Sequence, residues 1–498
     1  MPSNSNQTFA RVVVVAAVCV FSTQFGVTVV APLLGGWVAA SETPFLVAAL
    51  IFSAFTLVSA PLGVPGGVLS DRLGRKPLVV AGLLLYAAAS VLFPFSDDPY
   101  DWIFVRALQG AGAGLFFPAV SALLAEVTSQ DHEERGEERG GEQGEERGRA
   151  FSVYNIGLGV GLAAGPISGG LLFEAFGIFV PFLFCVGFAV LSAVLVAVLV
   201  QEPRERSERR RGGGLALGLA LGERERRALG TACVVIFFGI GVAAIMESLF
   251  SPFATNELRL STGVVGAVLS AMLAVFATLQ LGFSRLMQKV GEVGISAFGL
   301  FLCAVGLLML YFVTSVPSVL GLLLVSAVLG AGLGAVSLGT LTLASDAVGA
   351  GGGVRGEGEE RGKGEERGVG EEKGEREERG KREERGEREE RGAGEERGER
   401  EERGAGEERG EREERGVGGG KVMGIYYTAF YAGLGGVPLV CGVFSDILGA
   451  RLLFLGYAVL LFVLAFAVWQ GRVLRRGKTP APFNTEVANK TQEEKLCL

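Results

Sequence analysis

Several runs of this sequence are long, apolar and nearly free of charge. They lie at residues 12–38, 44–66, 78–95, 228–250, 262–283 and 297–313. A helix that crosses the roughly 30 Å hydrocarbon core of a bilayer needs about 20 such residues, since each residue rises about 1.5 Å. Backbone polar groups must pair within the chain in lipid, and runs this uniform do not suit barrel strands. The chain is therefore predicted to be an all-α polytopic membrane protein.

Twelve membrane-spanning helices are expected along the chain. They lie at about residues 9–38, 44–70, 76–96, 100–127, 150–175, 178–201, 229–254, 261–287, 292–314, 317–346, 422–447 and 450–474. The first is too long for the apolar part of a signal peptide, so we expect it to remain as a span. Alternate connections differ in charge: residues 72–76 and 204–211 are basic, whereas the other set has only Arg259 and Arg451. Because Lys and Arg stay on the cytoplasmic side during insertion, both termini are predicted to be cytoplasmic, in the cell membrane.

A basic linker at residues 202–228 divides the chain into two expected six-helix bundles. The N-terminal bundle is predicted at residues 1–201, the C-terminal bundle at 229–474 and a cytoplasmic tail at 475–498. The bundles resemble one another, because matching residues recur at constant spacings. With a spacing of 220, Gly110, Gly112, Gly114 and Glu126 match Gly330, Gly332, Gly334 and Asp346; with a spacing of 272, Tyr154, Gly161, Pro166, Gly170, Glu174 and Gly177 match Tyr426, Gly433, Pro438, Gly442, Asp446 and Gly449. Duplicated helical halves are typical of transporters, with the substrate site between them.

Two low-complexity inserts rich in Glu, Arg and Gly interrupt the bundles, at residues 131–149 and 351–420. Glycine recurs every six residues from Gly356 to Gly416 without an apolar stripe, which argues against a stable helix or a packed repeat. Residues 355–416 hold 25 Glu against 18 Arg plus Lys, a net charge of −7 that equals that of the whole chain. We expect the longer insert to be a disordered cytoplasmic loop that takes no part in transport.

The connection after the second expected span combines glycine with charge. It reads GGVLSDRLGRKP over residues 66–77 and contains Gly67, Asp71, Arg72, Gly74, Arg75 and Lys76. Gly67 allows a neighbouring helix to approach closely, and Gly74 relieves a tight turn. An unpaired carboxylate at a membrane edge is costly, so Asp71 needs the positive N-terminus of another helix or a nearby arginine. The basic residues also fit a simpler role as topology anchors.

This pattern closely resembles the signature of the major facilitator superfamily, G-x-x-x-D-R-x-G-R-[KR]. The resemblance extends to the number of spans, the charge of the loops and the internal repeat. It implies the major facilitator fold, with twelve helices in two pseudo-symmetric bundles. It also implies that the cluster latches the bundles in an outward-open state, with Glu126 as its acidic partner. A degraded copy at residues 284–291 has Gln288 in the Asp position, so the latch is expected on one side only.

Two further motifs resemble those of the same superfamily. The fourth span contains RALQGAGAG, with Arg106 and Gln109, which is similar to the motif R-x-x-Q-G whose arginine is linked in the family to proton transfer. An arginine within a span is costly and indicates function, although it can also snorkel to the outer interface. The fifth span contains GLGVGLAAGPISGG, which resembles the antiporter motif at Gly157, Gly161, Gly165, Pro166, Gly169 and Gly170. A smooth glycine face with a proline bend would seal the centre against proton leak, and generic glycine packing is the alternative.

Few polar residues interrupt the expected spans. Glu247 is the sharpest candidate, because it is the only carboxylate well inside an apolar run. Transfer of a carboxyl group out of water favours its neutral form, so Glu247 is a candidate to load and release a proton. The alternative is a position near the outer mouth, where it is solvated or paired. The candidates for the substrate cavity are Gln24, Gln109, Tyr154, Asn155, Gln280, Tyr426 and Tyr427, each of which also fits a simple interhelical hydrogen bond.

These observations predict a secondary active transporter that exports a drug-like compound or metabolite by proton-coupled alternating access. The proton gradient supplies the energy, and no cofactor, metal or nucleic acid is expected; the protein is expected to act as a monomer. One alternative is a symporter or facilitator for uptake of a sugar or organic acid, and another is a sensor or scaffold that acts through the cytoplasmic repeat. An enzyme is not expected, because the single histidine lies in a repeat and no Walker A or metal-ligand spacing occurs.

Overall fold

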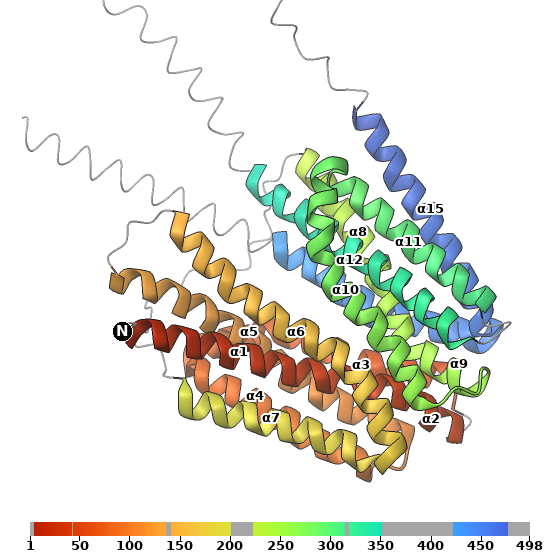
Figure 1. Ribbon diagram of the computed structural model, residues 1–498, viewed down its shortest axis with the longest axis horizontal. Coiled ribbons are helices and arrows are strands. Elements are labelled where there is room, and N and C mark those ends of the chain that lie inside the picture. The colour runs from red at the N-terminus through yellow and green to blue at the C-terminus, as the bar shows by residue number, and fades with distance from the viewer. Residues whose placement is uncertain are drawn as a thin grey trace, which may run out of the picture.

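The computed structural model describes residues 4–41, 43–135, 141–200, 223–313, 318–350 and 422–476. The regular structure of these residues is entirely helical (Figure 1). Twelve helical stretches within them are long and apolar enough to cross a membrane. The prediction of an all-α polytopic membrane protein is therefore confirmed.

The N-terminal bundle contains the first six spans. Its helices are α1 (Asn4–Thr28), α2 (Val30–Ser41), α3 (Phe45–Leu73), α4 (Arg75–Leu92) with the short η1 (Phe93–Phe95), α5 (Pro99–Arg135), α6 (Gly141–Phe176) and α7 (Phe179–Leu199). Together α1 and α2 form the first span, which is interrupted at the single residue Val29. The second span ends at Gly74, whose φ of 102° lies in the region that glycine adopts without strain, so α4 can begin at the next residue.

The C-terminal bundle contains the other six spans. Its helices are α8 (Glu223–Ile245), the π-helical turn η2 (Met246–Phe250), α9 (Ser251–Asn256), α10 (Thr262–Val290), α11 (Glu292–Val313), α12 (Val319–Ala350), a helix at Val422–Leu448 that we call the eleventh span, and α15 (Ala450–Arg476). The seventh span is therefore not one regular helix but α8, η2 and α9 in succession. Pro252 lies in the first turn of α9 and lacks an amide hydrogen, so regular α-helical bonding cannot continue through it.

Helices extend into segments that were expected to be linker or insert. Within the shorter insert, α5 continues to Arg135 and α6 begins at Gly141. The first turn of α8, which begins at Glu223, lies within the expected linker. Glu and Arg are good helix formers, and extending an existing helix avoids the cost of nucleating a new one. The expected insert at 351–420 and the part of the tail after Arg476 lie outside the described residues.

Two glycines that correspond in the internal repeat, Gly112 and Gly332, pack in the same way in the two bundles. Gly112 of α5 lies against Gly82 of α4, and Gly332 of α12 lies against Gly299 of α11. In each case a Cβ atom on either glycine would meet the backbone carbonyl oxygen of the other at 2.7 to 2.9 Å, which is too close for any side chain. The helix pairs can approach this closely because glycine lacks a side chain.

The two bundles meet mainly at one end of the molecule. We call this the distal end; it carries the connections at residues 43–44, 177–178, 257–261 and 449, and the opposite, proximal end carries Asn4 and Arg476. Contacts between bundles join α6 to α10, α2 to α9 and α3 to the eleventh span. Figure 1 shows α2, α3 and α9 together at this end, while the N-terminal and C-terminal bundles diverge toward the proximal end.

Candidate functional site

Arg106 is buried in the interior of the N-terminal bundle. It projects from α5, and only 1% of its surface is exposed. One guanidinium nitrogen donates to the carbonyl oxygen of Val27 at 3.4 Å and to Oε1 of Gln109 at 3.2 Å. The guanidinium carbon also lies 5.0 Å from the centre of the Phe55 ring, within the range of a cation–π interaction. Arg106 therefore does not snorkel to the membrane surface.

Gln109 holds this arginine from one turn away on the same helix. It is fully buried, and its amide nitrogen donates to Oγ of Ser90 on α4 at 2.9 Å. The Ser90 hydroxyl donates in turn to the carbonyl oxygen of Tyr86 at 2.8 Å. This chain of hydrogen bonds fixes the orientation of the Gln109 amide, so that its oxygen is presented to Arg106. Among the described residues, Nε of Arg106 has no hydrogen-bond partner, which leaves one charged donor unused in a buried site.

Glu247 approaches this cluster from the C-terminal bundle. It lies in the π-helical turn η2, and only 5% of its surface is exposed. This turn packs against α2 and α3 of the N-terminal bundle, and the carboxylate interacts electrostatically with Arg106. Glu247 is thus buried between the bundles and is not solvated at the membrane surface. Single π-helical turns inside α-helices frequently mark functional sites.

The glycines of α6 form one continuous face against α1. Gly157, Gly161, Gly165 and Gly169 each lie so close to a backbone carbonyl of the first span that a Cβ atom would collide with it. Pro166 cannot donate to the carbonyl oxygen of Leu162, and this oxygen instead accepts a hydrogen bond from Oγ1 of Thr28 at 3.2 Å. The spacing of four residues and the proline are both used for packing between α6 and α1.

The opposite face of α6 touches the C-terminal bundle. Beside the proline, the amide nitrogen of Ile167 donates to Oγ of Ser270 on α10 at 2.8 Å. Gly170 lies against Thr262 and Gly263 in the first turn of α10, where a Cβ atom would come within 2.9 Å of the Gly263 Cα. The antiporter-like motif therefore connects α1 within its own bundle to α10 of the other bundle.

The structure describes only some of the side chains of the predicted latch. Gly67 has one neighbour at an ordinary distance, Cβ of Pro118 at 3.9 Å, so the expectation that it permits a close helix approach is wrong. That role belongs to Gly66, where a Cβ atom would lie 2.5 Å from the carbonyl oxygen of Gly114. Glycine is needed at the residue where α3 and α5 cross. The side chains of Asp71 and Glu126 lie outside the described residues, and the roles predicted for them, Arg72, Arg75 and Lys76 stay predictions.

The tyrosines predicted for the cavity differ in exposure. Tyr154 and Tyr426 are buried, and the hydroxyl of Tyr426 bonds with Oγ1 of Thr340 at 3.1 Å within the C-terminal bundle. Tyr427 is 47% exposed. The place of these tyrosines in a substrate cavity stays a prediction.

The three remaining candidates for the substrate cavity, all with amide side chains, also differ in exposure. Asn155 is exposed, whereas Gln24 and Gln280 are partly buried. Gln24 of α1 faces the glycine stripe of α6, since a Cβ atom on Gly161 would lie 3.1 Å from its Cβ. Gln280 lies beside Gly334 of α12. Both glutamines therefore lie close to helices of their own bundle.

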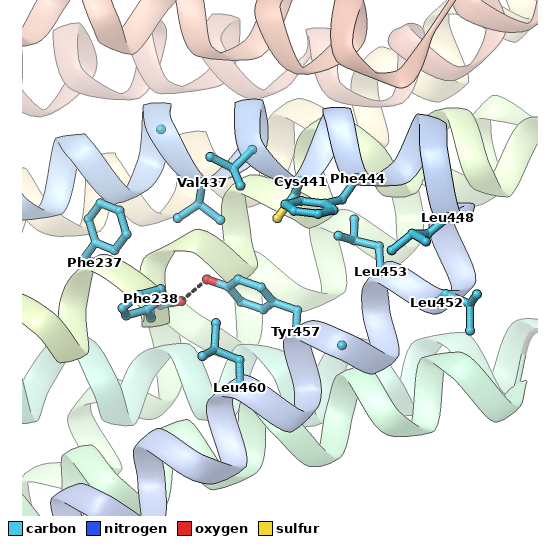
Figure 2. A pocket seen from close by; sticks show the side chains of 13 residues that line it. Phe237, Phe238, Val437, Cys441, Phe444, Leu448, Leu452, Leu453, Tyr457 and Leu460 are labelled. Carbon is cyan, nitrogen blue, oxygen red and sulfur yellow. Dashed lines mark hydrogen bonds between the residues drawn. The ribbon is translucent and has the colours of Figure 1, made fainter.

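An apolar pocket of about 380 Å³ lies within the C-terminal bundle (Figure 2). Figure 2 shows Phe237 and Phe238 of α8, Val437, Cys441 and Phe444 of the eleventh span, and Leu453, Tyr457 and Leu460 of α15 around it. The Tyr457 hydroxyl donates to the carbonyl oxygen of Phe238 at 2.8 Å. The lining is otherwise almost entirely apolar, so this pocket offers little to recognise a polar substrate and is separate from the Arg106–Glu247 pair.

Two carboxylates at the distal end make contacts that none of the sequence motifs predicts. Glu174 accepts a hydrogen bond from the backbone of α10, and Asp446 accepts two from the backbone of α3. The sequence held a signal for them, because the repeat places Glu174 and Asp446 at equivalent positions. Their hydrogen-bond donors are backbone N–H groups, which leave no trace in a sequence pattern.

Comparisons with known proteins agree with this arrangement. The profile of the Major Facilitator Superfamily matches residues 16–357, which is more than half of the chain. An uncharacterised MFS-type transporter of Methanocaldococcus jannaschii is 23% identical over 313 residues, covering 62% of this chain and 76% of that protein. Multidrug resistance protein 2 of Bacillus subtilis is 26% identical over 257 residues, covering 51% of this chain and 59% of that protein.

Solved structures show the same fold at low sequence identity. A bacterial homologue of the human lysosomal transporter Spinster, in an inward-facing and unoccupied conformation, has a TM-score of 0.61 at 13% identity, covering 94% of this chain and 97% of that one. The nucleoside transporter NupG has a TM-score of 0.55 at 12% identity, covering 94% of this chain and 99% of that one. With twelve spans in two similarly packed bundles and a profile match over most of its length, the chain belongs to the major facilitator superfamily of membrane transporters.

Proposed function

We propose that this protein exports a drug-like compound or metabolite across the cytoplasmic membrane in exchange for protons. The observation that carries the proposal is the burial of Arg106 and Glu247, two ionisable groups on different bundles, where the turn that holds Glu247 packs against α2 and α3 of the other bundle. Ionisable groups inside a membrane are costly and mark ion or substrate pathways. Because the partners belong to different bundles, any motion of one bundle against the other changes their separation.

In the proposed mechanism, Glu247 exchanges a proton and thereby changes its attraction to Arg106. When Glu247 is ionised, the pair attracts the bundles toward each other. When Glu247 is protonated, this attraction is lost, and the bundles separate more readily at that level. Gln109 and Ser90 keep the guanidinium in place during the cycle, so that the change in charge acts on the position of η2.

The motif on α6 supports exchange as the mode of coupling. Its glycine face packs α6 tightly on α1, and the amide of Ile167, next to the proline, donates to Ser270 of α10. A tightly packed helix at the centre limits the water through which protons would leak. The multidrug resistance proteins among the relatives favour an exported, drug-like substrate over a nutrient.

We also propose that the distal end faces the outside of the cell and the termini face the cytoplasm. The basic connection at residues 72–76 lies at the proximal end, as the positive-inside rule requires for cytoplasmic loops. The contacts between bundles gather at the distal end, so the structure corresponds to a state closed toward the outside. Alternating access then consists of separating α3 from the eleventh span and α6 from α10 at that end.

Proton flux in everted membrane vesicles tests the proposal. The vesicle lumen is acidified, and ethidium, tetraphenylphosphonium, a nucleoside and a sugar are added in turn. Under the export reading, at least one compound releases protons from the lumen in vesicles that contain the protein. Glu247→Gln should abolish this release while keeping substrate binding. Glu257→Gln is the matched control, because Glu257 pairs with Arg451 within the C-terminal bundle and lies exposed at the distal end.

Two results would contradict the proposal. Accumulation of a compound together with protons, rather than in exchange for them, would indicate a symporter. An unchanged pH profile in Glu247→Gln would reject Glu247 as the proton carrier. Deletion of residues 351–416 separates a transporter from a scaffold: transport should persist, whereas a scaffold would lose its function.

A further inference from the structure

Two carboxylates at the distal end each bind the first turn of a helix in the other bundle. Asp446 of the eleventh span accepts hydrogen bonds from the backbone nitrogens of Phe45 and Leu46, at 2.7 Å to Oδ1 and 3.1 Å to Oδ2. Glu174 of α6 accepts one from the backbone nitrogen of Gly263, at 2.7 Å to Oε1. Phe45 and Gly263 lie at the starts of α3 and α10, where backbone N–H groups have no partner within the helix.

The two contacts are equivalent under the internal repeat. Glu174 and Asp446 each lie three residues before the glycine that ends their helix, and those glycines, Gly177 and Gly449, have φ values of 77° and 84°. The contact from the N-terminal bundle reaches the C-terminal bundle, and the other contact runs in the opposite direction. Such a crosswise pair joins the bundles at two places at the same end.

Each carboxylate is poorly placed within its own helix. The C-terminus of a helix carries partial negative charge, so an acid in the last turn is unfavourable there. The N-terminus of a partner helix carries the opposite partial charge and supplies free N–H donors. The interaction becomes favourable only when the bundles are in contact, because only then does the positive helix end face the acid.

A glycine one turn before each acid lets its helix approach the other bundle closely enough for these hydrogen bonds to form. Gly442 lies one turn before Asp446, and a Cβ atom there would come within 2.9 Å of the Leu46 Cα. Gly170 lies one turn before Glu174 and is equally close to the Gly263 Cα. The same arrangement of a glycine followed four residues later by an acid thus occurs at both contacts.

We propose that Glu174 and Asp446 are paired gate residues that hold the distal end closed and release together when it opens. Each stabilises the closed state through charge-assisted hydrogen bonds to the other bundle, which the open state lacks. The inference rests on the alternating-access part of the proposed function. It does not depend on the substrate, on proton coupling or on the role of Glu247.

The test uses the full chain in lipid nanodiscs with Asp446→Asn, Asp446→Ala, Glu174→Gln and the double variant Glu174→Gln/Asp446→Asn. Hydrogen exchange is measured for peptides that contain the first turns of α3 and α10. The matched controls are Asp98→Asn and Glu257→Gln. Asp98 accepts from the backbone nitrogen of Tyr100 at 2.9 Å within the N-terminal bundle, and Glu257 pairs within the C-terminal bundle.

We expect each substitution to reduce protection from hydrogen exchange in the bundle that does not carry it, at the helix start that its carboxylate contacts. Asp446→Asn should speed exchange at the start of α3 about fivefold, and Asp446→Ala about tenfold or more. Glu174→Gln should do the same at the start of α10 and leave the start of α3 nearly unchanged. The double variant should also lengthen the distance between spin labels at Phe95 and Leu320, two exposed residues at the distal ends of different bundles.

In the control variants, hydrogen exchange of both peptides and the distance between the spin labels should be the same as in the parent protein. Faster exchange confined to the substituted bundle, or a label distance unchanged in the double variant, would overturn the proposal. Exchange at the buried centre of α5 reports whether each variant is folded. Asp446→Glu keeps the charge and should retain most of the protection from hydrogen exchange at the start of α3. If exchange there became as fast as in Asp446→Ala, the proposed gate role of Asp446 would also be contradicted.

Discussion

Alanine at Gly170 should change the balance between conformations more than it changes folding. In the structure, an alanine Cβ at this position would lie 2.4 Å from the Thr262 carbonyl oxygen and 2.9 Å from the Gly263 Cα, whereas ordinary contacts begin at 3.4 Å. The start of α10 therefore has to move away by about 1 Å. Overpacking of this kind costs about 1–3 kcal/mol. The two residues lie in different bundles, so the cost disappears when the distal end opens.

The same substitution at Gly161 should destabilise the folded protein instead. Its Cβ would lie 2.5 Å from the Phe21 carbonyl oxygen and 3.0 Å from the Phe21 Cα, both in the same bundle. Opening the distal end does not relieve this clash. Alanine regains about 1 kcal/mol of helix propensity, which offsets part of the cost in unfolding experiments. This gain in helix propensity does not affect the equilibrium between the closed and open states, because α6 is helical in both.

The expected shift follows from these numbers. A cost of 1–3 kcal/mol that is present only in the closed state raises the population ratio of open to closed about 5- to 150-fold. The distance between spin labels at Phe95 and Leu320 measures this ratio, in a background whose accessible cysteines are serine. Thermal unfolding of the same samples measures stability. Gly187→Ala is the control, since nothing lies within 4 Å of a Cβ there.

Two outcomes would refute the reasoning. If Gly170→Ala lowered the melting temperature as much as Gly161→Ala and left the label distances unchanged, the clash would not lie between moving parts. If Gly187→Ala shifted the distances as much as Gly170→Ala, the effect would come from helix propensity and not from packing.

Three further predictions concern the buried polar groups and the predicted latch. Arg106→Met should leave Glu247 without its cationic partner and abolish proton-driven transport, while Arg106→Met/Glu247→Gln should recover stability but not coupling in thermal-shift and vesicle assays. Thr28→Val should leave the carbonyl oxygen of Leu162 unpaired and cost about 1–3 kcal/mol in stability, which a melting curve in detergent will show. Asp71→Asn should insert normally but transport poorly, and wild-type turnover in that variant would count against the latch.

The sequence was sufficient for the fold because the bilayer imposes a simple rule. Long apolar runs must be helices, and their number and the charge of their connections follow directly from the chain. The repeat matched Gly112 with Gly332, and the structure shows that the two pack alike. Sequence reasoning was wrong at Gly67, because two adjacent glycines differ only in which one faces the neighbouring helix.

The candidate site was predictable only as a list of unusual residues. Arg106 and Glu247 are conspicuous because charge within a span is costly. Their proximity was not predictable, since it depends on how two bundles are docked, and the two residues are 141 positions apart in the chain. The break of the seventh span into α8, η2 and α9 likewise depends on how the segment around Pro252 packs, because a proline alone does not specify a π-helical turn.

Local composition and spacing were enough to establish the class of the protein, the number of its spans, its internal repeat and the residues that are costly to bury. They were enough because the membrane environment converts apolar runs into helices. Which costly residues compensate one another depends on the packing of the two bundles. That packing buried Glu247 against the bundle that holds Arg106, and it aimed Glu174 and Asp446 at the helix starts of the opposite bundle. Such pairings rest on backbone positions brought together by docking, and backbone N–H groups carry no signal in a sequence.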